Sequence, residues 1–346
     1  MSVRQIFLDQ GVGETRGVVT LDGRPERLLI HRDDDDQKLA LGARLVARVA
    51  AIEPAMSSAF LDLGDGQQAI LAFKPDAKPV RGATVEIEIR AEPREGKLAV
   101  ARFIGAGEGA PRALSAPPSL SESLRHFVRD VGVVEGPEAR AIADEAEAEV
   151  LQILHPLPGG GTLAIEPTRA LTAIDVDLGE RKGADVKRAS RQANLAALGE
   201  AARLLRLKGL GGLVVIDLVG RGHDGNALLA AARVAFAPDN PGVAIGPVGR
   251  FGTMELSIPR RTRPVLERLR QPDGSLTDRT IAQRLIRRLE DEAAAQPGAR
   301  LVATCSPYLA ATVEGLVREL GERFGHRFTV SLDANRPRDQ IDVRSA

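Results

Sequence analysis

The run Leu171-Thr-Ala-Ile-Asp175-Val-Asp177 and the later run Gly212-Leu-Val-Val-Ile-Asp217-Leu decide the architecture of this part of the chain. Each holds four or five apolar residues rich in β-branched types and is bounded by polar or glycine-rich stretches, which is typical of a buried parallel strand. Between them, residues 185–208 carry apolar residues at three- and four-residue spacing, which predicts a helix. Because strand, helix and strand form a crossover unit, we expect the two strands to be parallel, and adjacent or nearly so.

The two aspartates that end these runs, Asp175 and Asp217, are candidate metal ligands. They fall toward the carboxyl ends of their strands, where open α/β sheets place ligands. Neighbouring strands lie roughly 5 Å apart, so the two carboxylates would repel each other unless they shared a hard cation such as Mg²⁺. The alternative is that each aspartate caps a helix or opens a turn. Asp177 shares the strand face of Asp175 and is either an outer carboxylate of the site or the start of the loop.

The composition fits a multidomain enzyme whose cores are built from aliphatic residues. The 346 residues are 43% hydrophobic but only 3% aromatic. The formal net charge is zero, so total charge does not by itself indicate a nucleic-acid partner. Basic residues gather within 181–191 and 260–270, beside the aspartate strands, as phosphate contacts would, although such runs also occur on ordinary solvated surfaces. Acidic residues gather at 33–36 and 144–149.

The single cysteine, Cys305, argues against a disulfide framework and against a zinc site built from cysteines. No apolar run reaches the roughly 18 residues that a membrane span needs, and the N-terminus lacks the apolar region of a signal peptide. We therefore expect a cytoplasmic protein with no membrane partner. The five histidines lack the spacing of metal ligands and are interpreted as ordinary surface or core residues.

The order of predicted elements divides the chain into several parts. Residues 1–36 alternate in short strands with a turn at Asp22-Gly23, and residues 39–105 predict five short strands, which suit a small closed barrel. Glycine and proline mark residues 106–119 as a linker. The remaining predictions are helices at 120–131, 138–154 and 278–295, strands at 162–166, 300–304 and 327–332, and a helix ending near 324.

Several stretches resemble the bacterial ribonuclease E/G family. They are Val46-Ala-Arg-Val-Ala-Ala-Ile-Glu-Pro, Ala59-Phe-Leu-Asp-Leu-Gly64, Leu171-Thr-Ala-Ile-Asp-Val, Asn194-Leu, Leu205-Arg-Leu-Lys-Gly-Leu-Gly-Gly-Leu-Val-Val-Ile-Asp217 and Gly249-Arg-Phe-Gly-Thr-Met-Glu-Leu-Ser. The similarity runs over most of the chain, and the block from Leu157 to Ser257 is its most specific part.

The resemblance implies an α+β multidomain fold with a defined division of the chain. The implied parts are the N-terminal strands of a ribonuclease-H-like scaffold (1–37), an OB-fold β-barrel RNA-binding module (38–105), a linker (106–119), the helical remainder of the scaffold (120–166), a deoxyribonuclease-I-like α/β catalytic domain (167–262) and a small C-terminal α/β domain (275–346).

The resemblance also implies an endonuclease specific for single-stranded RNA, which leaves 5′-phosphate and 3′-hydroxyl ends in RNA processing or decay, including that of ribosomal RNA. In such an enzyme Asp175 and Asp217 hold one Mg²⁺, for which Mn²⁺ is an alternative. Candidate contacts to the RNA phosphates are Arg181, Lys187, Arg188, Arg191 and Arg250, with Asn194 as a further polar partner.

In the barrel, Phe60 matches an aromatic residue with which the family contacts RNA, and Lys97 is a candidate contact to the RNA backbone. Where a second aromatic residue aligns, this chain has Ile70, and losing a stacked base costs about 1 to 3 kcal/mol. The alternative for Phe60 is a place in the barrel core.

Other departures from the family bear on substrate capture and assembly. The Arg-Thr pair of the family's pocket for a 5′-monophosphate is missing after the barrel, and the zinc-binding Cys-x-x-Cys is missing between Arg263 and Thr277. We therefore expect no 5′-end sensor and no zinc, with a homodimer left open only through other contacts. Asp177 stands where the family typically has Asn, and Ile258-Pro259 replaces a basic residue.

Two further functions remain open beside the RNA endonuclease. The first is a non-catalytic RNA-binding or ribosome-associated protein that kept the scaffold. The second is cleavage of single-stranded DNA, because metal-dependent hydrolysis does not itself need a 2′-hydroxyl.

Overall fold

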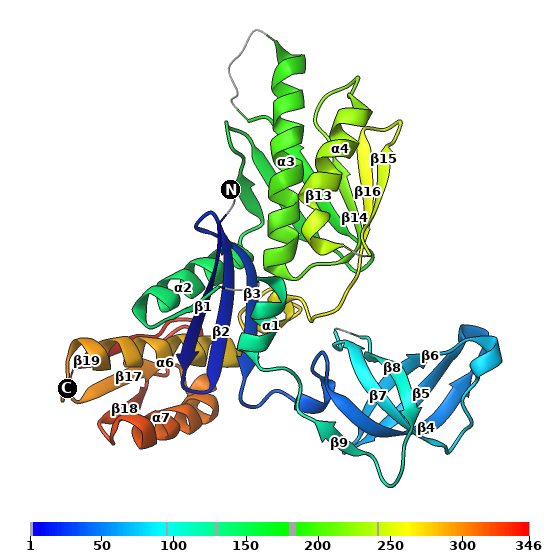
Figure 1. Ribbon diagram of the computed structural model, residues 1–346. Helices are drawn as coiled ribbons and strands as arrows, with labels where there is room; N and C mark the ends of the chain where they lie inside the picture. Colours follow the sequence, from blue (N-terminus) through cyan, green and yellow to red (C-terminus); the bar gives the residue numbers. More distant parts are fainter. Residues whose placement is uncertain (1–2, 95, 129–130, 180–184, 241, 346) are drawn as a thin grey trace.

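The fold is a mixed α+β arrangement of four β-sheets with helices packed against three of them (Figure 1). The computed structural model describes residues 3–94, 96–128, 131–179, 185–240 and 242–345. No helix among these residues is both long enough and apolar enough to cross a membrane.

The N-terminal sheet has the strand order β10-β1-β2-β3. Its strands are β1 (Arg4–Gly11), β2 (Glu14–Leu21), β3 (Arg24–Arg32) and β10 (Val133–Glu135). The predicted turn at Asp22-Gly23 joins β2 to β3, and both residues have positive φ, which matches the tight turn that right-twisted hairpins favour. Helix α1 (Leu120–Phe127) covers one face of this sheet, and α2 (Pro137–Leu151) packs on the other.

Residues 44–106 form a closed five-stranded barrel, as predicted. Its strands are β4 (Arg44–Glu53), β5 (Ser58–Gly64), β6 (Gln67–Ala72), β7 (Thr84–Ala91) and β8 (Ala99–Ala106), with short 3-10 turns η1 (Gln37–Leu39), η2 (Pro54–Met56) and η3 (Pro75–Ala77). The order is β5-β6-β8-β7-β4, and pairing of β4 with β5 closes the barrel. The segment expected to be a plain linker contains a strand, β9 (Arg112–Ser115), which pairs with β4.

The two apolar runs that end at Asp175 and Asp217 lie in a six-stranded sheet of order β11-β12-β13-β14-β16-β15. Its strands are β11 (Leu154–Pro156), β12 (Thr162–Pro167), β13 (Thr172–Asp177), β14 (Gly212–Asp217), β15 (Ala244–Val248) and β16 (Thr253–Ile258). As predicted, β13 and β14 are adjacent and parallel. Helices α3 (Val186–Lys208) and α4 (Gly225–Ala235), followed by η4 (Ala237–Asp239), cover one face and leave the other open.

The C-terminal part is a three-stranded sheet of order β18-β17-β19, with helices α6 and α7 packed against it. Its elements are α5 (Val265–Leu269), α6 (Asp278–Ala295), β17 (Leu301–Cys305), η5 (Pro307–Leu309), α7 (Ala310–Phe324), β18 (Phe328–Leu332) and β19 (Asp342–Ser345). Helix α6 has the bounds predicted from the sequence, 278–295, and the Thr277 side chain caps its N-terminus.

A buried network of ion pairs joins the N-terminal sheet to α2 and α6. The guanidinium of Arg16 lies 2.6 Å from Asp9 and 3.1 Å from Glu147, and Arg287 lies 2.7 Å from Glu14 and 2.9 Å from the same Glu147. All five side chains are buried. Removing one partner from such a network leaves an uncompensated buried charge, at a cost of about 3 to 5 kcal/mol. The acidic run at 144–149 is therefore partly structural.

Two buried titratable side chains support the end of α2. The Lys208 ammonium, at the last position of α3, donates to the carbonyl oxygens of Val150 (2.8 Å) and Gln152 (2.6 Å), which α2 leaves without helical partners. Burial lowers the pKa of Lys208 to about 8. His155, in the strand that follows α2, is also buried, and burial together with the nearby charge of Lys208 lowers its pKa to about 4.

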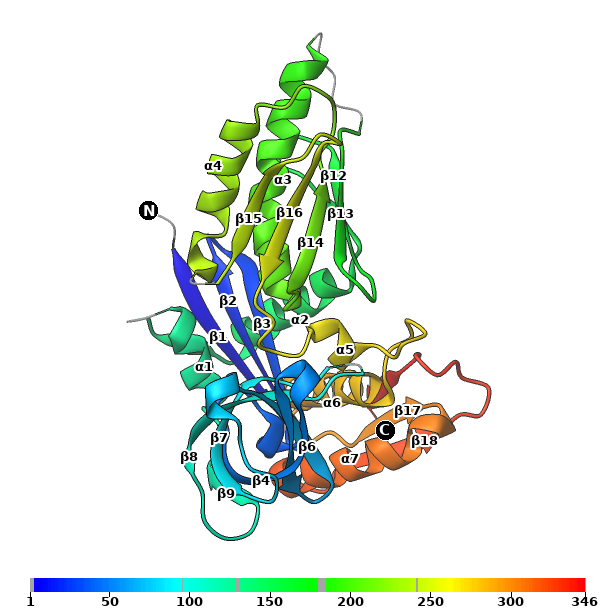
Figure 2. The ribbon, with the colours of Figure 1, turned by 90° about the vertical axis from the view of Figure 1, so that its right-hand side faces the viewer.

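The barrel is attached to the rest of the molecule by its two chain connections and by one docked turn. At that turn the backbone N–H of Glu92 donates to the carbonyl oxygen of Arg261 (2.8 Å), and its carboxylate accepts from the backbone N–H groups of Arg263 (2.9 Å) and Leu41 (3.3 Å). In both ribbon views the barrel lies at the opposite end of the molecule from the carboxyl ends of β13 and β14 (Figures 1 and 2).

Candidate active site

Asp175 and Asp217 are direct register partners on the adjacent parallel strands β13 and β14. On either side, Asp175 is opposite Ala164 of β12, and Asp217 is opposite Thr253 of β16. Residues opposite each other in a sheet point to the same side, so these four side chains form one row across the sheet. Ile174 and Ile216 point to the helix-covered face and are buried, and the aspartates therefore lie on the open face.

Both carboxylates of this pair are exposed and have no bonded partner among the described residues. No hydrogen bond or ion pair joins Asp175 or Asp217 to any other residue within the described ranges. Nor does any third His, Cys, Asp or Glu complete a group of three metal-ligating side chains in this part of the chain. Two neighbouring negative charges with no ion-pair partner in the described part of the chain fit a hard divalent ion that takes one or two carboxylates and completes its shell with water or phosphate oxygens.

The loops that follow β13 and β14 are held by specific hydrogen bonds. The carboxylate of Asp177 accepts from the backbone N–H of Gly179 (2.6 Å), so this aspartate opens the loop while its side chain stays exposed. The Asn194 side chain of α3 forms two bonds with the backbone of Val219, donating to its carbonyl and accepting from its N–H, each at 3.0 Å. These contacts fix the chain next to both members of the aspartate pair.

The position of Asn194 does not favour the RNA contact predicted for it. The residue is 1% exposed, and its amide oxygen and nitrogen are both engaged by Val219. Its observed place is that of a positioning residue for the loop after Asp217.

The basic residues predicted near α3 lie at its first turns. Lys187, Arg188 and Arg191 are exposed, and the guanidinium of Arg191 lies 3.6 Å from Asp224 at the start of α4. Cations at a helix N-terminus add to the positive end of the helix dipole, and here the N-cap carboxylate of Asp185, which accepts from the backbone N–H of Arg188, offsets part of that charge. This cluster is at the same end of the sheet as the aspartates but behind the helix-covered face. Arg181 lies outside the described residues.

The hairpin between β15 and β16 carries Arg250 beside an exposed aromatic residue that the sequence analysis did not single out. The Arg250 guanidinium lies 4.5 Å from the ring centre of Phe251, which is 78% exposed. The tip is fixed next to Asp217, because the N–H of Leu218 donates to the carbonyl of Gly252 (3.1 Å). The aromatic residue within the short glycine-bounded run Gly249-Arg-Phe-Gly252 was the signal that could have identified Phe251.

Gly252 and His223 pack against each other beneath this tip. Gly252 has φ +88°, and a Cβ there would lie 3.3 Å from His223 Nε2, so both the backbone and the space favour glycine. His223 belongs to the loop after β14, and its Nε2 is buried without a hydrogen-bond partner in the described structure.

In the barrel, Phe60 and Ile70 are direct cross-strand partners on β5 and β6. Both are partly exposed, whereas their neighbours Ala59, Leu61 and Leu71 are buried inside the barrel. Phe60 therefore lies on the outer surface and not in the core. Lys97 is exposed in the turn between β7 and β8.

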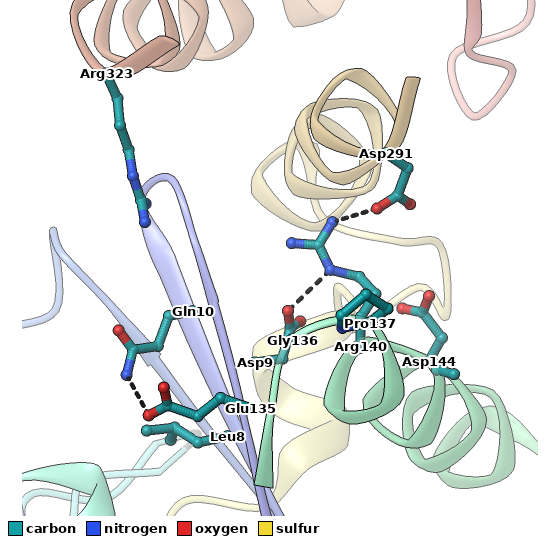
Figure 3. Close-up of a pocket in the computed structure, with 11 residues that line it drawn as sticks. Leu8, Asp9, Gln10, Glu135, Gly136, Pro137, Arg140, Asp144, Asp291 and Arg323 are labelled. Carbon is teal, nitrogen blue, oxygen red and sulfur yellow. Dashed lines mark hydrogen bonds and ion pairs between the residues drawn. The ribbon is translucent and has the colours of Figure 1, made fainter. Parts of the chain in front are cut away.

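A cavity lies elsewhere in the described structure, between β1, α2, α6 and α7 (Figure 3). It has a volume of about 570 Å³ and is lined mainly by polar side chains, several of which bond to one another. Arg140 donates to Asp9 (2.8 Å) and Asp291 (2.9 Å), and Gln10 donates to Glu135 (3.3 Å). Burial raises the pKa of Asp291. The cavity thus belongs to the polar contact between the N-terminal sheet and α6, away from the aspartate pair.

A family model and several known proteins match the region of the chain that carries the two aspartates. The model of the "Ribonuclease E/G family" matches residues 132–261, which include both aspartates but not the barrel. Ribonuclease E of Haemophilus influenzae is 34% identical over 160 residues, which are 44% of this chain and 17% of that protein. Ribonuclease E of Escherichia coli is 38% identical over 107 residues, 30% of this chain and 10% of that protein.

A plant protein is similar over a stretch of comparable length. The chloroplastic ribonuclease E/G-like protein of Arabidopsis thaliana is 36% identical over 128 residues, 35% of this chain and 13% of its own length. The matched part thus spans less than a fifth of each of these three relatives. Over residues 132–261 this chain is therefore similar to the ribonuclease E/G family.

Proposed function

We propose that this protein is a Mg²⁺-dependent endonuclease that hydrolyses single-stranded RNA and leaves 5′-phosphate and 3′-hydroxyl ends, in RNA processing or decay. The observation that carries the proposal is the placement of Asp175 and Asp217 as exposed register partners that form no ion pair with any described residue. Ribonuclease E relatives that match this region support the same class of reaction.

The proposal interprets the parts of the fold in the family's terms. Around the barrel the strands follow the order β4-β5-β6-β8-β7 and return to β4, and β6 and β8 are parallel. This order supports an OB-fold that binds single strands. The six-stranded sheet with helices on one face supports a deoxyribonuclease-I-like catalytic domain. The N-terminal sheet with α1 and α2 then forms the ribonuclease-H-like scaffold, and residues 275–346 form the small C-terminal domain.

The proposed mechanism assigns separate tasks to the side chains around the pair. Asp175 and Asp217 bind the ion, and the small Ala164 beside them leaves room on the open face for a phosphodiester. Asn194 holds the loop after Asp217 in place through Val219. Arg250 on the hairpin contacts phosphate, and Lys187 and Arg188 attract the strand to this end of the sheet. When bound, Mg²⁺ supplies Lewis-acid chemistry to the scissile phosphate and the attacking water.

The barrel captures RNA at a distance from the cut. Phe60 stacks on a base, Ile70 adds apolar contact without stacking, and Lys97 contacts the backbone. Since the barrel and the aspartates lie at opposite ends of the molecule, a substrate that touches both must be long and unpaired (Figure 2).

The test is cleavage of a labelled, unstructured RNA that bears either a 5′-monophosphate or a 5′-hydroxyl, with Mg²⁺ or with a chelator. We expect Asp175→Asn and Asp217→Asn each to lower the cleavage rate at least about 100-fold, because each removes one of two ligands from a charge-stabilising site. Asp177→Asn is the matched control: it makes the same change on the same strand face, at a position whose register partner is Thr162 and not a carboxylate.

The outcomes separate the proposal from its main competitor. Chelator-sensitive internal cleavage that survives Asp177→Asn but not Asp217→Asn supports the nuclease, and equal rates on both 5′ ends support the missing end sensor. RNA binding without cleavage in either Mg²⁺ or Mn²⁺ would instead make this a non-catalytic RNA-binding protein.

A further inference from the structure

The hairpin tip Gly249–Gly252 presents one aromatic ring to solvent beside the aspartate pair. Phe251 is 78% exposed, and only Tyr308, at 81%, is a more exposed aromatic residue of the described chain. A single exposed apolar residue is common on protein surfaces, so exposure alone carries no argument. Here, however, the ring belongs to a tip that is rigidly held.

Three backbone hydrogen bonds hold that tip. The N–H of Gly249 donates to Thr253 (2.8 Å), that of Gly252 to Gly249 (3.0 Å) and that of Leu218 to Gly252 (3.1 Å). Thr253 is the register partner of Asp217, so the Cα of Phe251 lies within about 13 Å of that of Asp217. The ring therefore has a fixed place relative to the carboxylate that we assign to the ion.

The surroundings of the ring suit a nucleobase. The Arg250 guanidinium lies against one face of the ring, at 4.5 Å, where it adds positive charge next to a surface that a base can stack on. Aromatic side chains combined with cations are how proteins hold single strands without reading their sequence. The aspartates supply no such stacking surface, and Phe60 and Ile70 lie on the distant barrel.

We infer that Phe251 stacks on the base of a nucleotide flanking the scissile phosphate and so fixes which phosphodiester faces Asp175 and Asp217. The inference rests on the proposed function and adds a positioning surface beside the cut that is separate from the barrel. Because any base has a stacking face, Phe251 sets the position of the cut along the strand and not its sequence preference.

A binding measurement that needs no cleavage tests this directly. Short single-stranded RNAs carrying 2-aminopurine at successive positions are bound by Asp217→Asn protein, and the fluorescence quenching that accompanies stacking is recorded at each position. We expect quenching at the position that contacts Phe251, its loss in Asp217→Asn with Phe251→Ala, and its retention with Phe251→Trp. Tyr308→Ala is the matched control, an equally exposed aromatic residue outside the sheet.

A cleavage measurement in the otherwise unchanged protein gives the second readout. Phe251→Ala should lower kcat/KM by about 5- to 150-fold, the range that one stacked base represents. An abasic nucleotide at the stacked position should lower kcat/KM of the wild type by a similar factor. It should not lower kcat/KM of Phe251→Ala further, because both changes remove the same contact.

The two proposals fail in different ways. Cleavage that depends on Asp217 but is unaffected by Phe251→Ala, with unchanged quenching, overturns this inference alone. Absence of both cleavage and quenching at every position overturns it together with the nuclease.

Discussion

Replacing Asp217 by Asn should make the metal-free protein more stable, although it should abolish cleavage. Asp175 and Asp217 are register partners on neighbouring strands, so their charges lie roughly 5 Å apart. Both are exposed, so a water-like dielectric constant applies, and two unit charges at that distance repel by about 1 kcal/mol at low ionic strength. For a unit of 150 to 250 residues this amounts to a rise of about 2 to 4 °C in melting temperature.

The assay is thermal unfolding in low salt, with EDTA or with Mg²⁺. In EDTA, Asp217→Asn should melt above the wild type, whereas Asp177→Asn, which has no carboxylate opposite it, should change the melting temperature less. Mg²⁺ should reverse the order, since ion at 100 times its dissociation constant stabilises the wild type by about 2.7 kcal/mol and the variant has lost a ligand.

Two results would refute this reasoning. If Asp217→Asn melts at or below the wild type in EDTA, the carboxylates do not repel as their register requires. If Mg²⁺ raises both melting temperatures equally, the ion does not bind at this pair.

Three further predictions concern other parts of the molecule. The folded state holds His155 neutral down to about pH 4, whereas the unfolded chain binds that proton near pH 6.5. The free energy of unfolding should therefore fall by about 3 kcal/mol as the pH drops from 6.5 to 4. Urea titrations should show that this loss is absent in His155→Gln. Lys208→Met keeps the apolar stem but leaves carbonyls at the end of α2 unpaired, and it should lower the free energy of unfolding by about 2 to 3 kcal/mol in the same assay at pH 7. Ile70→Phe should tighten the binding of single-stranded RNA by about 5- to 150-fold, and Phe60→Leu should weaken it by a comparable factor, as measured by fluorescence anisotropy. If neither variant changes the affinity, this face of the barrel does not bind RNA.

Local patterns in the sequence were sufficient to predict the elements around the aspartate pair. The apolar runs that end at Asp175 and Asp217 and the periodic stretch between them predicted two parallel neighbouring strands, and their register is set by burial of Ile174 and Ile216 on one face. The barrel strands were equally visible, because alternation of buried and exposed residues is a local signal.

Contacts between distant parts of the chain could not be predicted in the same way. Strand β9 (Arg112–Ser115) has four exposed residues and no alternation, and only its pairing with β4 makes it a strand. Two basic residues of the 260–270 cluster have structural partners that the sequence did not indicate: Arg260 donates to Gly211, and Arg268 lies 2.7 Å from Asp35. Asn194 was grouped with RNA contacts because its type suits them, whereas its burial depends on a loop 25 positions later in the sequence.

The buried ion network has a consequence for how the chain folds during synthesis. Glu14 and Arg16 are made long before their partner residues Glu147 and Arg287. Until α6 has left the ribosome, the N-terminal sheet would have to bury charges without their counterions, which costs more than leaving them in water. The barrel, whose strands are contiguous from residue 44 to 106, has no such delay. The order of folding therefore differs from the order of synthesis: the barrel folds before the N-terminal sheet that precedes it, and that sheet is completed only once α6 has been made.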